Sequence, residues 1–179
     1  MRRTALRLCF VTVLAAVMLP SAVSCQVTVV LTRHAEKAST PPKDPPLTEA
    51  GKLRAELLAS MLGDSGVEAI YVTEFQRTQQ TAAPLAARAH VTPTVLPARD
   101  SAAVVQAIRA RASGVVVVVG HSNTVPDIIS ALGGPKVELS DSQYDNLFLL
   151  TVGPSPSSLL RLHYGDTAPV QPQGNSMVK

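Results

Sequence analysis

Two histidines and two arginines of this chain lie where predicted strands end or helices begin. Arg33 and His34 directly follow an apolar run. His121 follows five valines and Gly120, and Arg77 comes shortly after another apolar run. If these runs are parallel strands of one sheet, their ends meet at one rim, where two guanidiniums then face two imidazoles. Such a cluster is unfavourable without an anion, and guanidinium forks match phosphate oxygens, so the pattern predicts a phosphate site.

Each of these residues taken alone has an ordinary interpretation. A single histidine after a strand is usually structural or exposed, and an arginine at a helix start is usually a solvated charge. We give His90 and His163 that interpretation. The other four residues differ because they share one predicted rim.

Sequence signals for other classes of catalyst are missing. The chain has no Gly-rich loop ending in Lys-Ser/Thr, no acidic cluster for Mg²⁺, no histidine pair at metal-ligand spacing and no Gly-x-Ser-x-Gly turn. A phosphate site built from arginine and histidine therefore predicts that imidazole itself is the nucleophile, with no metal and no cofactor.

Strand and helix signals alternate along the chain. Apolar, β-branched runs predict strands at residues 26–32, 69–72, 94–96, 115–119, 146–152 and 158–164. Amphipathic spacing predicts helices at residues 48–63, 77–89, 101–111 and 125–132. The alternation predicts a three-layer α/β/α sandwich with a mostly parallel central sheet.

Two of these helices carry more detailed expectations. Residues 48–63 are expected to turn four leucines inward, namely Leu53, Leu57, Leu58 and Leu62. Pro84 lies inside residues 77–89, so it either kinks that helix or marks its real start. Val104, Val105 and Ile108 are expected to form the inner face of residues 101–111.

Four segments in the same order resemble the motifs of the histidine phosphatase superfamily. They are TRHAEK (32–37), LTEAG (47–51), FQRTQQTA (75–82) and VGHSN (119–123). Four motifs in the family order make a specific match across roughly residues 27–132. YDNL (144–147) is also similar to small bacterial members. The resemblance implies a phosphoglycerate mutase-like fold.

The resemblance also implies residue roles. His34 would attack phosphorus and form a phosphohistidine, which water then hydrolyses. Arg33, Arg77 and His121 would bind the phosphoryl oxygens. Asn123 would add a substrate hydrogen bond, and Thr78 another, unless either only caps a helix.

The general acid is less evident. Asp100 is the best candidate between Arg77 and His121, although it can equally be the N-cap of the following helix; Glu36 and Glu74 are weaker candidates. The short interval leaves no room for a lid, so we expect an open site that favours hydrolysis of phosphomonoesters. A mutase or phosphotransferase, or a non-catalytic phospho-ligand binder, remain the alternatives.

Residues 1–25 predict a secretory signal peptide. Three arginines precede an apolar run from Leu8 to Leu19, and Pro20 and small residues follow. The protein is therefore expected to be exported, to the periplasm or outside the cell. An uncleaved anchor helix and lipidation of Cys25 are the less favoured alternatives, and membrane attachment is expected only if Cys25 is lipidated.

Composition predicts one globular domain over residues 26–165 and a loose tail over 166–179. Hydrophobic residues make up 46% of the chain and charged residues 16%. Residues 1–25 hold three arginines and no acid, which leaves 13 basic and 13 acidic residues in the remainder. The positive net charge therefore gives no reason to expect a nucleic-acid partner. The expected partner is a phosphorylated small molecule or phosphoprotein substrate.

Overall fold

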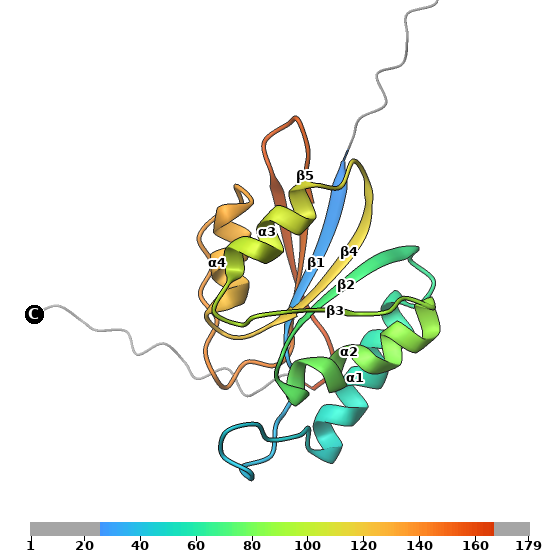
Figure 1. Ribbon diagram of the computed structural model, residues 1–179, viewed down its shortest axis with the longest axis vertical. Coiled ribbons are helices and arrows are strands. Elements are labelled where there is room, and N and C mark those ends of the chain that lie inside the picture. The colour runs from blue at the N-terminus through green and yellow to red at the C-terminus, as the bar shows by residue number, and fades with distance from the viewer. Residues whose placement is uncertain (1–25, 167–179) are drawn as a thin grey trace, which may run out of the picture.

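The computed structural model describes residues 26–166, and a six-stranded sheet forms its centre (Figure 1). The strands are β1 (Val27–Arg33), β2 (Val67–Thr73), β3 (Thr94–Leu96), β4 (Gly114–Gly120), β5 (Asn146–Val152) and β6 (Ser158–His163). They lie in the order β3-β2-β4-β1-β5-β6. The first four run parallel, whereas β5 and β6 pair antiparallel with their neighbours. The prediction of a mostly parallel sheet is confirmed.

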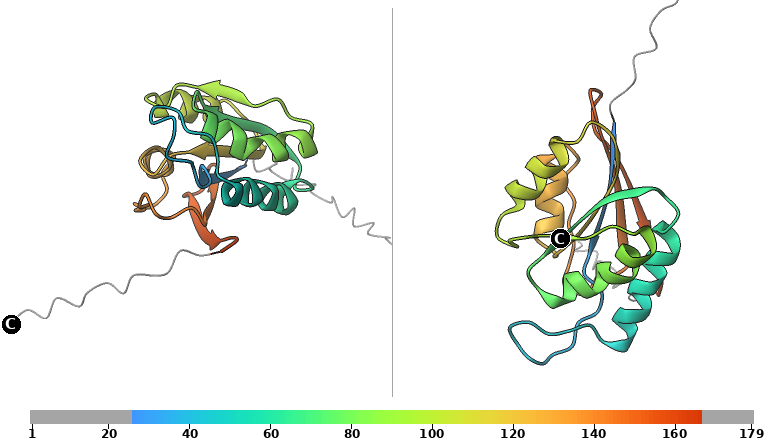
Figure 2. Two further views of the ribbon diagram at one scale, coloured as in Figure 1. Left: turned by 90° about the horizontal axis from the view of Figure 1, so that it is seen from below. Right: turned by 45° about the vertical axis from the view of Figure 1, so that its right-hand side comes forward.

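Among the described residues, helices cover both faces of this sheet. They are α1 (Glu49–Leu62), α2 (Gln76–Ala89), α3 (Ser101–Arg109) and α4 (Thr124–Ala131). The helices α1 and α2 pack on one face, and α3 and α4 pack on the other, as the right-hand view of Figure 2 shows. The predicted three-layer α/β/α sandwich is therefore confirmed.

The valine-rich strand β4 lies between β2 and β1 at the middle of the sheet. Val116 and Val118 pack into the core beneath α3 and α4. Val117 and Val119 pack into the core beneath α1 and α2. A strand covered on both faces needs apolar side chains at every position, which explains the uninterrupted run.

The predicted inner face of α1 is partly wrong. Leu58 and Leu62 are buried as expected, but Leu53 is 72% exposed and Leu57 is 37% exposed. Arg54 points inward and is only 8% exposed. Its guanidinium pairs with a carboxylate from the loop after β1 and donates to two backbone carbonyls, so it can be buried at this position.

The remaining element boundaries agree with expectation to within about two residues, except at Pro84. The helix α2 runs from Gln76 across Pro84, so that proline does not mark its start. Val104, Val105 and Ile108 form the buried face of α3, as predicted.

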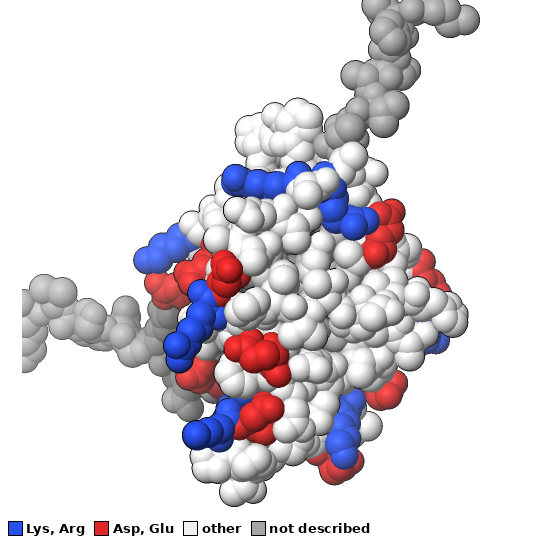
Figure 3. Space-filling model, in the orientation of Figure 1, with Lys and Arg blue, Asp and Glu red and all other residues white. Residues whose placement is uncertain are grey.

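The predicted signal peptide (residues 1–25) lies outside the described residues, as does the predicted tail apart from Asp166. Within residues 26–166, no helix is long and apolar enough to cross a bilayer. On the face drawn in Figure 3, basic and acidic side chains alternate and form no large patch of one sign.

Candidate active site

The carboxyl ends of three parallel strands bring the predicted residues to one edge of the sheet. Arg33 closes β1 and lies opposite Gly120, which closes β4. His34 follows β1, and its backbone N–H donates to the Gly120 carbonyl at 2.9 Å. His121 follows Gly120, and its ring centroid lies 5.4 Å from that of His34. Arg77 reaches the same edge from α2, which follows β2.

His34 is 3% exposed and is fixed through one ring nitrogen. Nδ1 lies 2.8 Å from the carbonyl oxygen of Ala35. A carbonyl can only accept, so Nδ1 carries the proton and Nε2 keeps the lone pair for the pocket. Burial is the main cause that lowers the pKa of His34 to about 3, and the charges of Arg33 and Arg77 add to it. The hydrogen bond to Ala35 acts in the opposite direction.

The second histidine, His121, is held by a chain of hydroxyl groups. Its Nε2 lies 3.0 Å from Thr73 Oγ1. Thr73 Oγ1 lies 2.9 Å from Thr78 Oγ1, at the start of α2. Burial lowers the pKa of His121 to about 4, and Arg77 lowers it further while Glu74 opposes the shift. Both imidazoles are therefore neutral at pH 7 in the free protein.

Arg33 is buried, and not all of its N–H donors have an acceptor. Its Nη1 donates to the Ser140 carbonyl at 3.1 Å, and its Nη2 lies 3.5 Å from the carboxylate of Asp141. The guanidinium stacks over the ring of Tyr144, 4.3 Å from the centroid. Its Nε is buried and meets no acceptor among residues 26–166. Because the Arg33 side chain lines the pocket and its Nη2 has only a long contact to Asp141, its guanidinium is suited to an anion there.

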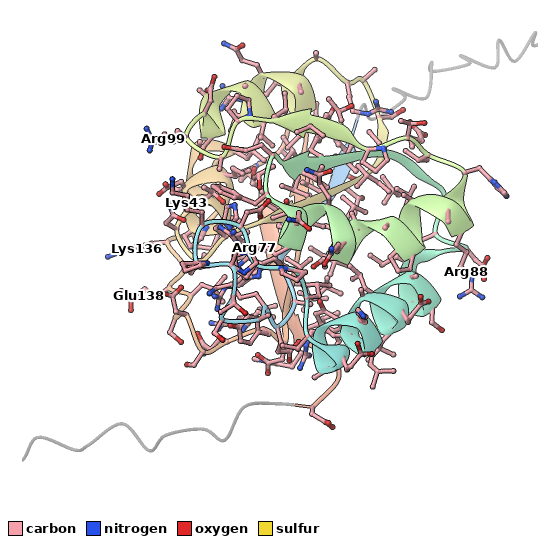
Figure 4. All side chains as sticks on the ribbon, turned by 60° about the horizontal axis from the view of Figure 1, so that its bottom comes forward. Lys43, Arg77, Arg88, Arg99, Lys136 and Glu138 are labelled. Atoms are coloured by element: carbon pink, nitrogen blue, oxygen red, sulfur yellow. The ribbon has the colours of Figure 1, made fainter. Side chains whose placement is uncertain are left out.

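Arg77 has similar surroundings. Its guanidinium lies 4.1 Å from the ring centroid of Phe75, and its Nη1 lies 3.9 Å from Asp44 Oδ1. Its Nε is likewise buried without an acceptor in the described part of the chain. Burial and the charge of Arg33 lower the pKa of Arg77, which Asp44 raises. In Figure 4, Arg77 lies centrally beside the loop after β1, whereas Arg88 of the same helix lies at the outer end.

These four residues face one pocket of about 350 Å³, which we call the catalytic pocket. Its other lining residues are Lys37, Ser122, Asn123, Asp141 and Tyr144. Three cationic side chains and two neutral imidazoles thus oppose one carboxylate. This balance favours an anion with several oxygens, such as a phosphoryl group.

Sequence reasoning assigned no role to four of these residues. Lys37 and Ser122 lie within the segments TRHAEK (32–37) and VGHSN (119–123), so their place in those motifs could have indicated them. Asp141 and Tyr144 lie in the loop before β5; Tyr144 opens the segment YDNL (144–147), whose resemblance to small bacterial members was the available signal, whereas no motif includes Asp141. Only the fold brings that loop to the pocket.

The remaining predicted site residues lie in different places. Asn123 lines the catalytic pocket and is exposed, as a substrate-contacting residue must be. Thr78 does not line the pocket but supports Thr73. Asp100 is not brought to the pocket: it is the N-cap of α3, and its Oδ1 accepts from the backbone N–H of Ala103 at 2.9 Å. The structure therefore favours the capping interpretation of Asp100.

The one carboxylate on the pocket is poorly suited to donate a proton. Ser122 Oγ donates to Asp141 Oδ1 at 2.6 Å. This hydrogen bond, together with the charge of Arg33, lowers the pKa of Asp141. Asp141 is therefore ionised at neutral pH. Residues 26–166 also contain no cluster of three or more His, Cys, Asp or Glu side chains arranged to hold a metal ion.

Comparison with known proteins gives relatives of the same fold. The protein histidine phosphatase SixA, solved with tungstate, superposes with a TM-score of 0.61 at 21% identity, covering 76% of this chain and 96% of its own. A mycobacterial glucosyl-3-phosphoglycerate phosphatase gives 0.60 at 14% identity, covering 78% of this chain and 100% of its own. A structure described as mycobacterial hydrolase 2 gives 0.59 at 14% identity, covering 82% and 94%. No curated protein sequence matches.

At these identities, likeness to solved structures shows the fold alone. The family model of the histidine phosphatase superfamily (branch 1) matches residues 29–98, which include Arg33, His34 and Arg77. The fold adds His121 at the same edge of the sheet. The chain therefore resembles the histidine phosphatase superfamily over residues 29–98 and has the fold of its solved relatives.

Proposed function

We propose that the protein is a metal-independent phosphatase that hydrolyses phosphomonoesters through a phosphohistidine on His34. The observation that carries this proposal is the state of His34. Its ring is neutral, its Nδ1 is held by Ala35, and its Nε2 lone pair faces a pocket with unsatisfied guanidinium donors. An imidazole in this state is an activated nucleophile beside an anion site.

In the first step, Nε2 of His34 attacks phosphorus, and the bond between phosphorus and the leaving oxygen breaks. The guanidiniums of Arg33 and Arg77 bind the equatorial oxygens and offset the charge that develops on them. His121, positioned by Thr73, contacts the same oxygens. In the second step, water attacks the phosphohistidine, which releases phosphate and restores His34.

Within residues 26–166, the pocket lining contains no carboxylic acid that would be protonated at neutral pH and could donate to the leaving group. Asp141 stays ionised, and Asp100 caps α3. Substrates whose leaving group departs readily as an anion, such as aryl phosphates, should therefore react faster than alkyl phosphates. The missing proton donor also suggests a second candidate function. The phosphorus–nitrogen bond of phosphohistidine is labile as well, so its cleavage makes little demand on a general acid. Dephosphorylation of phosphohistidine in a protein is consistent with the open pocket and with the name of the relative SixA.

The test is hydrolysis of an aryl phosphate by the purified protein in the presence of a chelator. We expect turnover by the wild type and none by His34→Ala. The control is His90→Asn. His90 is exposed and its backbone is in the left-handed region, which asparagine also adopts readily. Turnover that survives in His34→Ala would disprove the role of His34, and turnover that requires added metal would disprove metal independence. A phosphoryl acceptor assay separates hydrolysis from mutase or phosphotransferase activity.

We further propose that residues 1–25 direct export. Support comes from the arginines, the apolar run and the small residues of that segment. Expressed in a bacterium, the full chain should appear outside the cytoplasm without its first residues, as N-terminal sequencing would show. Cys25→Ser separates simple secretion from lipid attachment. A full-length chain that stays in the cytoplasm would disprove export.

A further inference from the structure

A second hollow of about 520 Å³ lies beside the catalytic pocket, and we call it the α1 trough. Ala50, Leu53 and Leu57 of α1 form its apolar wall. Leu53 is among the most exposed large apolar side chains of the described chain. No step of the proposed hydrolysis uses this surface.

The trough and the catalytic pocket share a boundary. Tyr144 lines both hollows. Glu36 lines the trough while the next residue, Lys37, lines the pocket. In the same way, Ser142 lines the trough while Asp141 lines the pocket. A group attached to a phosphoryl group in the pocket can therefore reach the trough by crossing Tyr144, whose ring centroid is 6.0 Å from that of His34.

Arg54 and Glu36 in the trough are already paired with each other. Arg54 Nε and Nη2 donate to the Glu36 carboxylate at 3.0 and 2.8 Å. Its Nη1 donates to the Tyr164 carbonyl at 2.6 Å, and Nη2 also donates to the Asp166 carbonyl at 2.9 Å. Four of the five guanidinium N–H donors are thus used, and Glu36 and Asp166 place two carboxylates on the trough, so it is poorly suited to a second phosphate group. The uncharged group that it suits is an apolar one.

We infer that the α1 trough binds the leaving group of the substrate, and that the preferred substrates are phosphomonoesters with an extended apolar leaving group. This inference depends on the proposed phosphatase function. The phosphoryl group occupies the catalytic pocket, the leaving group crosses Tyr144, and its far end covers Leu53 and Leu57. Selectivity among substrates then comes from the apolar surface that binding removes from water, and not from a second charged contact.

A series of 4-alkylphenyl phosphates tests this inference, because lengthening the chain from methyl to butyl scarcely changes the acidity of the leaving phenol. For the wild type, kcat/KM should rise about threefold to tenfold along the series. Leu53→Ser and Leu57→Ser should flatten the rise and leave the methyl ester nearly unaffected. The matched control is Met61→Ser, which also removes an exposed apolar side chain from α1 but does not line the trough. It should keep the full rise.

The outcomes separate this inference from the proposed function. Turnover that is independent of chain length, or a rise that both trough variants keep, would overturn the inference and leave the phosphatase intact. If no ester is hydrolysed, the proposed function fails, and calorimetric titration of the same esters still tests the trough through the ratio of their affinities. A flat affinity series, or trough variants that change only the oligomeric state, would assign the apolar wall to another contact and overturn the inference.

Discussion

At His34, the surroundings and not the imidazole itself decide the protonation state. The ring is buried among cations, which lowers its pKa to about 3, and the Ala35 carbonyl selects the tautomer. His121 is also neutral, with a pKa of about 4. The free protein therefore presents two uncharged rings and two guanidiniums to an incoming phosphate.

One consequence is the pH dependence of activity. Because His34 and His121 lose their protons far below pH 6.5, neither should limit kcat/KM between pH 5 and 7. After correction for ionisation of an aryl phosphate substrate, we expect a plateau in this range and a decline only toward about pH 4. A decline with an apparent pKa near 6.5 would show that His34 titrates normally and that its burial does not control the reaction.

Thr81 links the two catalytic motifs through one hydroxyl group. Its Oγ1 accepts from the Ala35 backbone N–H at 2.9 Å and donates to the Arg77 carbonyl at 2.7 Å. Thr81 is fully buried and does not line the pocket, so it is a positioning residue. It sets the loop that holds His34 relative to the first turn of α2.

Replacing this hydroxyl should reduce the rate more than substrate binding. In Thr81→Val, the Ala35 N–H loses its acceptor, while the Arg77 carbonyl loses the hydroxyl donor and keeps its helical hydrogen bond. We expect kcat to fall about tenfold to a hundredfold with little change in KM. Thr81→Ser keeps the hydroxyl and should restore most of kcat. Equal losses in both variants, or a change in KM alone, would contradict a positioning role.

At the scale of elements, α1 holds the loop after β1 in place. Thr48 caps the helix by accepting from the Gly51 backbone N–H, and the Thr48 N–H donates to the Glu36 carbonyl at 2.9 Å. The Arg54 guanidinium pairs with the Glu36 carboxylate. Since Glu36 is only two residues after His34, the start of α1 helps to fix the proposed nucleophile.

Gly51 is required for this close approach. A Cβ at this position would overlap the carbonyl oxygen of Glu36. Gly51→Ala should therefore displace the loop, lower the free energy of unfolding by about 1 to 3 kcal/mol and lower kcat. Denaturant unfolding and kinetics measure the two effects. Lys52→Ala, an exposed change in the same turn, should affect neither, and an unperturbed Gly51→Ala would show that the loop tolerates the shift.

For the whole molecule, the buried histidines couple stability to pH. The folded-state pKa of His34 lies below its unfolded value, so the unfolded chain binds more protons between pH 6.5 and 3. The contribution of neutral His34 to the free energy of unfolding is fully present above about pH 6.5 and is lost as the pH decreases toward 3. The pKa of His34 falls from 6.5 to about 3, and at about 1.4 kcal/mol per unit of pKa difference this gives a loss of up to about 5 kcal/mol.

Denaturant unfolding at a series of pH values measures this loss. His34→Asn should flatten the pH dependence in this window, because it removes the titrating group. If the catalytic pocket binds a tetrahedral oxyanion as proposed, tungstate should raise the midpoint of thermal unfolding and should do so less in His34→Asn. At a hundred times its dissociation constant, such a ligand stabilises the fold by about 2.7 kcal/mol. A stability that is constant from pH 6.5 to 4 would contradict the burial of neutral His34.

The sequence by itself determined the layers of the fold and the four residues that face the pocket. Apolar runs specify buried strands through their composition, and in a parallel sheet their ends meet at one edge wherever the chain is long enough to cross over. Arg33, His34 and His121 directly follow such runs, and Arg77 follows another within a few residues, so local sequence located them.

Only the tertiary structure decided which other groups surround them. Leu53, which was expected to face inward, is exposed on α1, and Arg54 is buried because the partners of its guanidinium lie in the loop after β1 and in the segment after β6. Asp141 and Tyr144 reach the pocket from the loop before β5, and Asp100 is not brought to it. Contacts between segments so distant along the chain depend on how the layers pack, and neither residue type nor local spacing records that packing.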